Sequence, residues 1–142
     1  MPARTSEATW EGTLREGSGS FVVGEDYFEG EMSFVARFED EAGESEKTNP
    51  EELIGAAHAA CFSMALSADL ERAGYDPEQV ETTATVHLED LEISTIELET
   101  AVSVSGIEDD EFQEIAQGAK ANCPVSKALA SVPEMTLQAR LA

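Results

Sequence analysis

One long apolar segment constrains the fold of this chain more than any other feature. Residues 53–68 (LIGAAHAACFSMALSA) contain no formally charged side chain. A helix that is apolar on every side is typically buried, and this segment is shorter than the roughly 20 apolar residues of a membrane span. We therefore expect a central helix that the rest of the fold covers, and a second subunit could cover it as well.

The same helix has clear signals at both ends. Asn49 is a favourable N-cap, Pro50 suits the first helical position, and the two glutamates that follow complement the positive end of the helix dipole. Gly74 is typical of a helix C-cap. The sequence predicts a helix that runs from residue 50 to about Ala73.

Strand patterns precede and follow this helix. Before it, we expect a hairpin of strands at residues 8–14 and 20–23 around a turn at 15–20, then a strand at 32–38 and an acidic loop at 39–48. After it, alternating apolar residues predict strands at 80–91, 92–105 and 135–141 and helices at 108–121 and 125–130. The order βββαββααβ indicates a single α+β domain over residues 1–142, with mostly antiparallel strands around the central helix.

The acidic balance limits the partners. The chain has 30 Asp and Glu against 8 Lys and Arg, a formal net charge of −22 spread along its length. Such a surface repels phosphate backbones and anionic lipids, so we expect neither nucleic acid nor a membrane as a partner. Self-repulsion of this size favours a protein that works in high salt, as halophile proteins do, although a merely acidic mesophilic protein is the alternative.

The two cysteines leave two interpretations open. Residues 1–11 carry acids and no apolar signal core, so we expect a cytoplasmic protein, in which two distant cysteines are more often inert than functional. However, Cys61 lies among small residues of the central helix, and Cys123 lies at the break before Pro124. The free N–H groups at the start of the next helix would favour a thiolate there.

Other chemistries have weaker support. His58 lies three residues before Cys61 on the same helix face, where it is either a base for a thiolate or a neutral histidine packed in the core. His87 is the only other histidine, and without a CxxC or HxxxH spacing we expect no metal site. The chain has no GxSxG motif, and the glycine-rich turn at residues 17–19 lacks the lysine of a phosphate loop.

Two segments resemble the signature segments of the OsmC/Ohr family, and more closely those of its OsmC branch. They are residues 49–67 (NPEELIGAAHAACFSMALS) and 119–129 (AKANCPVSKAL). The resemblance extends through ATWEG, Arg37-Phe38 and GIEDDEF, and so covers nearly the whole chain. It implies the OsmC-like fold and an intertwined homodimer. It also implies a thiol-dependent peroxidase of oxidative and osmotic stress defence that reduces organic hydroperoxides and, more weakly, hydrogen peroxide.

The resemblance also implies roles for four residues and a reductant. Cys61 would be the peroxidatic thiol and Cys123 the resolving thiol, while Arg37 would be the active-site arginine and Glu51 its partner carboxylate. A guanidinium beside Cys61 would lower the pKa of that thiol and hydrogen-bond the peroxide. The Cys61 sulfenic acid would then condense with Cys123 to a disulfide. A dithiol such as a dihydrolipoyl group, carried by a lipoylated protein, would reduce it, with no bound cofactor.

The spacing of two of these residues favours a dimer. Glu51 and Cys61 are ten positions apart on one predicted helix, hence about 15 Å along its axis and on different faces. If both serve one site, Glu51 comes from the other chain. The apolar neighbours Phe62 and Met64 suit an organic hydroperoxide.

Two functions without catalysis stay open. One is a module that binds a small apolar ligand, with the cysteines as packing residues. The other is a salt-stress structural protein that has lost its chemistry. The complete set of Arg37, Glu51, Cys61 and Cys123 argues against that loss.

Overall fold

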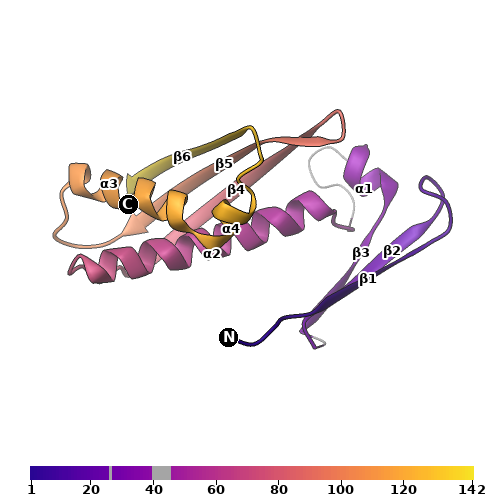
Figure 1. The fold of residues 1–142 in the computed structure, drawn as a ribbon, viewed down its shortest axis with the longest axis horizontal. Coiled ribbons are helices and arrows are strands. Elements are labelled where there is room, and N and C mark those ends of the chain that lie inside the picture. Colours follow the sequence, from indigo (N-terminus) through magenta and orange to yellow (C-terminus); the bar gives the residue numbers. More distant parts are fainter. Residues whose placement is uncertain (26, 40–45) are drawn as a thin grey trace. The chain divides into compact units, whose positions relative to one another are not determined.

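The computed structural model describes residues 1–25, 27–39 and 46–142, and its chain forms two compact units (Figure 1). The first unit is Met1–Leu53 and the second is Ile54–Ala142. The fold is α+β with mostly antiparallel pairing, as predicted, because among the described residues three strand pairs are antiparallel and one is parallel. The order of elements is βββααββααβ, which adds one short helix to the prediction.

The first unit is built on a three-stranded antiparallel sheet in the order β1-β2-β3. Its strands are β1 (Ser6–Glu11), β2 (Ser18–Val23) and β3 (Phe28–Met32). The predicted hairpin forms, but its turn comes earlier than expected, because Gly12 adopts a φ of +94° and the Thr13 hydroxyl accepts a hydrogen bond from the Glu16 N–H.

The prediction of a strand at residues 32–38 was wrong. β3 ends at Met32, and α1 (Phe34–Phe38) follows as a short helix. Ser33 ends the extended backbone and caps α1, since its hydroxyl accepts a hydrogen bond from the Ala36 N–H at 3.1 Å. Phe34 and Phe38 then pair across one turn with ring centroids 4.9 Å apart. Arg37 therefore extends from a helix.

The long helix α2 (Pro50–Arg72) has the predicted boundaries. The Asn49 side chain accepts a hydrogen bond from the Glu52 N–H at 2.9 Å, and Gly74 adopts a φ of +97° after the last turn. Of the acidic loop predicted at residues 39–48, residues 40–45 lie outside the described residues. Thr48 pairs with Met32 of the first sheet.

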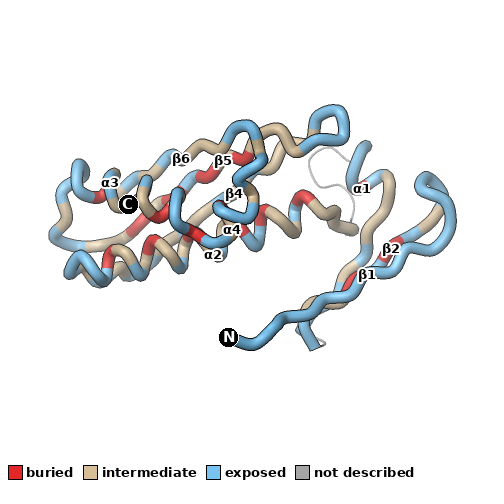
Figure 2. The backbone as a smooth tube through the Cα atoms, viewed as in Figure 1, coloured by how far each residue is buried: buried red, intermediate tan, exposed pale blue. Residues whose placement is uncertain are grey.

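α2 is buried along one side only. Four side chains spaced four residues apart are completely buried, and they are His58, Phe62, Leu66 and Leu70. These buried positions recur along α2 in Figure 2, whereas Met64 is 73% exposed. By length and composition α2 could cross a membrane, contrary to the expectation from the sequence, but the core helix of a soluble protein passes the same test. The full cover predicted for this helix is not present in the single chain.

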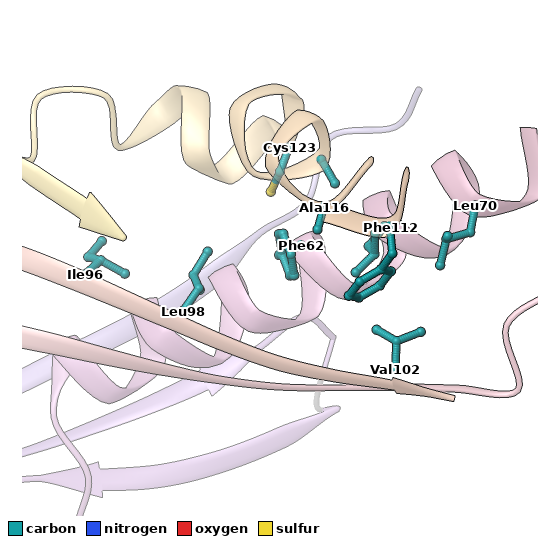
Figure 3. Close-up of a cluster of buried hydrophobic side chains, with 10 residues drawn as sticks. Phe62, Leu70, Ile96, Leu98, Val102, Phe112, Ala116 and Cys123 are labelled. Carbon is teal, nitrogen blue, oxygen red and sulfur yellow. The ribbon is translucent and has the colours of Figure 1, made fainter. Parts of the chain in front are cut away.

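The second unit contains most of the core. Its sheet has the order β4-β5-β6, with β4 (Gln79–Glu89) antiparallel and β6 (Glu134–Leu141) parallel to the central strand β5 (Glu92–Ser103). α3 (Asp109–Asn122) and α4 (Pro124–Ala128) lie between β5 and β6 in the chain. Figure 3 shows apolar side chains of α2, β5 and α3 meeting in one cluster, among them Phe62, Leu98 and Phe112.

Candidate functional site

The second unit brings the two cysteines together. Cys61 lies midway along α2 and Cys123 lies at the junction of α3 and α4, 62 residues later in the chain. Their sulfur atoms are 3.0 Å apart and both thiols are free. Cys123 is completely buried and Cys61 is partly exposed, and Figure 3 shows the Cys123 sulfur pointing toward α2. The pair is therefore arranged for thiol chemistry on its accessible member, Cys61.

Local sequence fixes the position of Cys123. Because Pro124 follows it, Cys123 avoids the helical backbone region and adopts φ −55° and ψ 127°. Its N–H still donates to the Ala119 carbonyl at 2.9 Å, and its own carbonyl accepts from the Lys127 N–H at 3.0 Å. Cys123 is thus the C-cap of α3 and the N-cap of α4. The predicted break between two helices is confirmed, with Cys123 at the junction.

The surroundings of the two sulfurs favour charge on Cys123. Burial opposes ionisation of Cys123, but the hydrogen bond with Cys61, with smaller contributions from Ser126 and Val125, lowers the pKa of Cys123 below its ordinary value. Burial and the hydrogen bond with Cys123 raise the pKa of Cys61. In the doubly protonated pair Cys123 donates to Cys61, and once Cys123 ionises, the Cys61 S–H donates instead. These directions hold for the pair within a single chain, and the roles that the resemblance implies for Cys61 and Cys123 stay predictions.

His58 is a neutral core histidine. It is completely buried, and burial lowers the pKa of its ring below the ordinary value of 6.5. Its Nε2 lies 2.7 Å from the Ser126 hydroxyl oxygen, while its Nδ1 has no hydrogen-bond partner among the described residues. Of the two interpretations of His58, the structure favours the packed neutral residue, in contact with Ser126.

Sequence reasoning missed Ser126. It is 6% exposed, and its hydroxyl oxygen contacts the ring of the buried His58. No local pattern predicts this contact, because the two residues are 68 positions apart in the chain.

The first unit holds the other two predicted site residues. Arg37 Nε lies 3.2 Å from both carboxylate oxygens of Glu51, and Arg37 Nη2 lies 2.8 Å from Oε1. The two side chains therefore form a bidentate ion pair. Glu51 is 7% exposed. The Asn49 side-chain amide donates to the Ala36 carbonyl at 2.9 Å and so ties α1 to the start of α2. The predicted pairing of Arg37 with Glu51 is present.

Two apolar neighbours of Cys61 differ in their surroundings. Phe62 is completely buried in the core of the second unit and cannot line a substrate site, which corrects the prediction. Met64 is exposed and lines a surface groove of about 430 Å³ together with Ser63, Ser67, Ala68 and residues 77–80. Of the two, Met64 alone is accessible to an apolar ligand.

Metal ligands do not converge in the part of the chain that the structure describes. There, no group of three or more His, Cys, Asp or Glu side chains is placed to hold a metal ion. His87 of β4 instead bonds the carboxylate of Glu97 on β5 at 2.7 Å.

Comparison with known proteins points in the same direction as the residues. The family described as OsmC-like protein matches residues 43–138. Peroxiredoxin OsmC of Escherichia coli (strain K12) is 44% identical over 143 residues, which span 97% of this chain and 96% of that protein. Peroxiredoxin OsmC of Shigella flexneri matches with the same identity and coverage.

Solved structures share the fold. An OsmC-like protein from Mycoplasma pneumoniae superposes with a TM-score of 0.74 at 14% identity, over 99% of this chain and 98% of that one. The organic hydroperoxide resistance protein OhrB of Bacillus subtilis superposes with a TM-score of 0.65 at 21% identity, over 97% and 98%. The predicted fold class is confirmed by this likeness.

Proposed function

The chain belongs to the OsmC-like protein family, and we propose that it reduces organic hydroperoxides with Cys61 and Cys123 as its redox pair. Its relationship to the peroxiredoxins named OsmC makes it an enzyme of the peroxidase class. The observation that carries the finer proposal is the sulfur–sulfur distance of 3.0 Å between residues 62 positions apart. A bond between them needs a movement of only about 1 Å, since a disulfide is about 2.05 Å long.

The proposed reaction has two steps at the cysteines. The Cys61 thiolate attacks the distal peroxide oxygen, the O–O bond breaks, and the alkoxide leaves and takes up a proton to become an alcohol. The Cys123 thiolate then attacks the sulfur of the Cys61 sulfenic acid. The S–S bond forms as the S–O bond breaks, and the hydroxide takes up a proton to become water. The exposure of Cys61 and the burial of Cys123 support this division of roles.

The first step requires a negative charge on Cys61. The single chain favours charge on Cys123, so a further positive group is needed beside Cys61. We assign this role to Arg37, which the bond to Glu51 holds in one orientation. The guanidinium would also donate hydrogen bonds to the peroxide and to the developing alkoxide.

Helix geometry supports a homodimer as the working form. Glu51 lies in the first turn of α2, and ten residues of continuous helix, about 15 Å of rise, separate it from Cys61. We propose that the Arg37–Glu51 pair of one chain serves the cysteines of its partner. The long apolar helix α2, buried along one side only, supports an arrangement in which a second copy covers the remainder.

The apolar character of that helix supports an organic substrate. The exposed Met64 on α2 offers an apolar contact that hydrogen peroxide cannot use. A small dithiol or a dihydrolipoyl group on a protein would reduce the disulfide, without a bound cofactor. We propose a cytoplasmic location for the protein. The net charge of −22 supports adaptation to high salt, which screens the repulsion between two copies of this acidic chain.

A turnover assay tests the proposal. Consumption of cumene hydroperoxide and of hydrogen peroxide is followed in molar KCl with dihydrolipoamide, for the wild type, Cys61→Ser and Cys123→Ser. We expect faster turnover with the organic peroxide, and loss of turnover in both variants. Equal background rates in all three folded proteins would contradict the proposal and favour a ligand-binding module.

A further inference from the structure

Two contacts with the same sequence spacing join α2 to the segment around α4. The Cys61 and Cys123 sulfurs lie 3.0 Å apart, and His58 Nε2 lies 2.7 Å from the Ser126 hydroxyl oxygen. His58 precedes Cys61 by three residues on α2, and Ser126 follows Cys123 by three residues in the first turn of α4. Residues three apart are neighbours on one face of a helix. The two contacts therefore lie side by side between the same two segments.

A histidine is a costly residue at position 58. The other three completely buried side chains of α2 are apolar, namely Phe62, Leu66 and Leu70. His58 is completely buried as well, and its Nδ1 has no hydrogen-bond partner among the described residues. Burial of a polar ring with an unsatisfied atom costs free energy that an apolar side chain would not cost. What an apolar side chain would lack here is the hydrogen bond to Ser126.

α4 depends on tertiary contacts for its position. It contains only five residues, and an isolated helix of that length is not stable in water. Val125 and Leu129 pack against the core cluster, but the hydrophobic effect has no direction. The bond between His58 and Ser126 is directional, because a hydrogen bond weakens steeply as it departs from linearity. It therefore restricts how α4, with Cys123 at its start, lies against α2.

We propose that His58 is a positioning residue for the redox pair, and that its hydrogen bond to Ser126 holds the Cys123 sulfur within reach of the Cys61 sulfur. In the dithiol form this bond keeps the two thiols ordered before they react, so less conformational entropy is lost when the S–S bond forms. The disulfide is thereby favoured over the dithiol. The inference deepens the proposed function, since it rests on Cys61 and Cys123 as the redox pair.

The unpartnered ring nitrogen indicates which atom donates the bond. If Nδ1 of His58 carried the proton, a buried N–H would be left unsatisfied, which is rarer in proteins than an unsatisfied acceptor. The proton therefore belongs on Nε2, which donates to the Ser126 hydroxyl oxygen. His58→Gln retains a side-chain N–H of similar reach, whereas His58→Leu removes the donor.

The test is the equilibrium between dithiol and disulfide, measured without any peroxide. The protein is equilibrated with mixtures of reduced and oxidised dithiothreitol at neutral pH in molar KCl. Cys61 and Cys123 each lose one hydrogen atom as their S–S bond forms, and oxidised dithiothreitol takes up both as its own S–S bond breaks. Free thiols are then alkylated, and the intact mass gives the fraction of each form. These fractions give the reduction potential of the pair.

The variants should change this equilibrium as a set. We expect Ser126→Ala and His58→Leu each to lower the equilibrium constant for disulfide formation about fivefold, in line with the loss of one hydrogen bond. The double variant should change it no more than either single variant, because both substitutions remove the same bond. Ser126→Thr and His58→Gln keep the hydroxyl and the N–H, and should give a constant close to that of the wild type.

Ser63→Ala is the matched control. It removes the donor of a hydrogen bond of the same length, 2.7 Å, that joins α2 to Thr82 of β4, and should leave the equilibrium constant unchanged. Unchanged constants in folded Ser126→Ala and His58→Leu would overturn the inference alone. A wild type that forms no disulfide in any mixture would contradict the proposed redox pair as well. If His58→Leu does not fold, the comparison of Ser126→Ala with Ser126→Thr decides.

Discussion

The two units of this chain differ in how tightly they are packed and in which residues of the proposed site they hold. In Met1–Leu53 the whole of β1 is exposed, and among the described residues the buried ones are few, namely Gly19, Phe21, Ala36 and Glu51. In Ile54–Ala142 ten apolar residues form one closed core. The well-packed unit holds the cysteine pair, and the sparsely packed unit holds the guanidinium and its carboxylate. The two residue pairs of the proposed site therefore come from units that differ in packing.

This contrast has a physical reason. A resolving thiol must be held close to its partner, which a dense core achieves, because side chains there occupy defined positions. An isolated three-stranded sheet needs a hydrophobic face that is covered by another element or another chain. The sparse burial of the first unit is thus consistent with a protein whose remaining cover comes from a second subunit.

Removal of a core ring should have the largest effect and should separate the two units. Phe112 is completely buried among α2, β5 and α3, so Phe112→Ala should lower the free energy of unfolding by about 3–5 kcal/mol. Phe21 of β2 retains 7% exposure and packs beside Phe28, so Phe21→Ala should cost less. Urea unfolding in molar KCl measures both. An equal loss of unfolding free energy in the two variants would contradict the claim that the two units differ in packing.

Substitution of Arg37 should lower peroxide turnover without lowering the stability of the fold. Arg37→Lys keeps the positive charge but loses the bidentate contact with Glu51. Peroxide turnover should therefore fall about 100-fold, with little change in the free energy of unfolding. Arg15→Lys is the matched control, since Arg15 lies over the Phe34 ring of the same unit. Stopped-flow oxidation of the thiols measures the rates. If Arg37→Lys reacts as fast as Arg15→Lys, the arginine has no role at the site.

Acid should weaken the second unit through His58. Burial lowers the pKa of His58 in the folded state, so below its unfolded value of 6.5 the unfolded chain binds a proton that the folded chain does not. Stability should therefore rise with pH up to about 6.5 and then level off. The slope attributable to His58 is at most about 1.4 kcal/mol per pH unit. The measurement is the free energy of unfolding of the wild type and of His58→Gln at several pH values. Below pH 6.5 the wild type should lose stability more steeply than His58→Gln as the pH falls, and parallel curves would contradict the prediction.

The sequence predicted what is decided locally. Asn49, Pro50 and Gly74 each act within one turn, and α2 begins and ends where they indicate. The apolar alternation of β4 and β5 placed both strands to within two residues. The strand predicted at residues 32–38 failed because the Ser33 side chain offers a helix cap that competes with the apolar pattern.

Contacts between distant segments were less accessible to sequence reasoning. Only the family resemblance suggested that Cys61 and Cys123 meet, because spacing alone says nothing about 62 intervening residues. The burial of Phe62 was missed for the same reason, since an all-apolar helix does not show which side faces the core. The contact of His58 with Ser126 joins α2 to α4 and has no local pattern.

The most direct test of the account is whether Cys61 and Cys123 form a disulfide within one chain. Reduced protein is treated with one equivalent of cumene hydroperoxide in molar KCl, and its free thiols and intact mass are measured under non-reducing conditions. The account predicts the loss of both thiols, a mass lower by two hydrogen atoms, and a peptide that links residues 61 and 123. Two remaining free thiols, or a disulfide that links two chains, would contradict it.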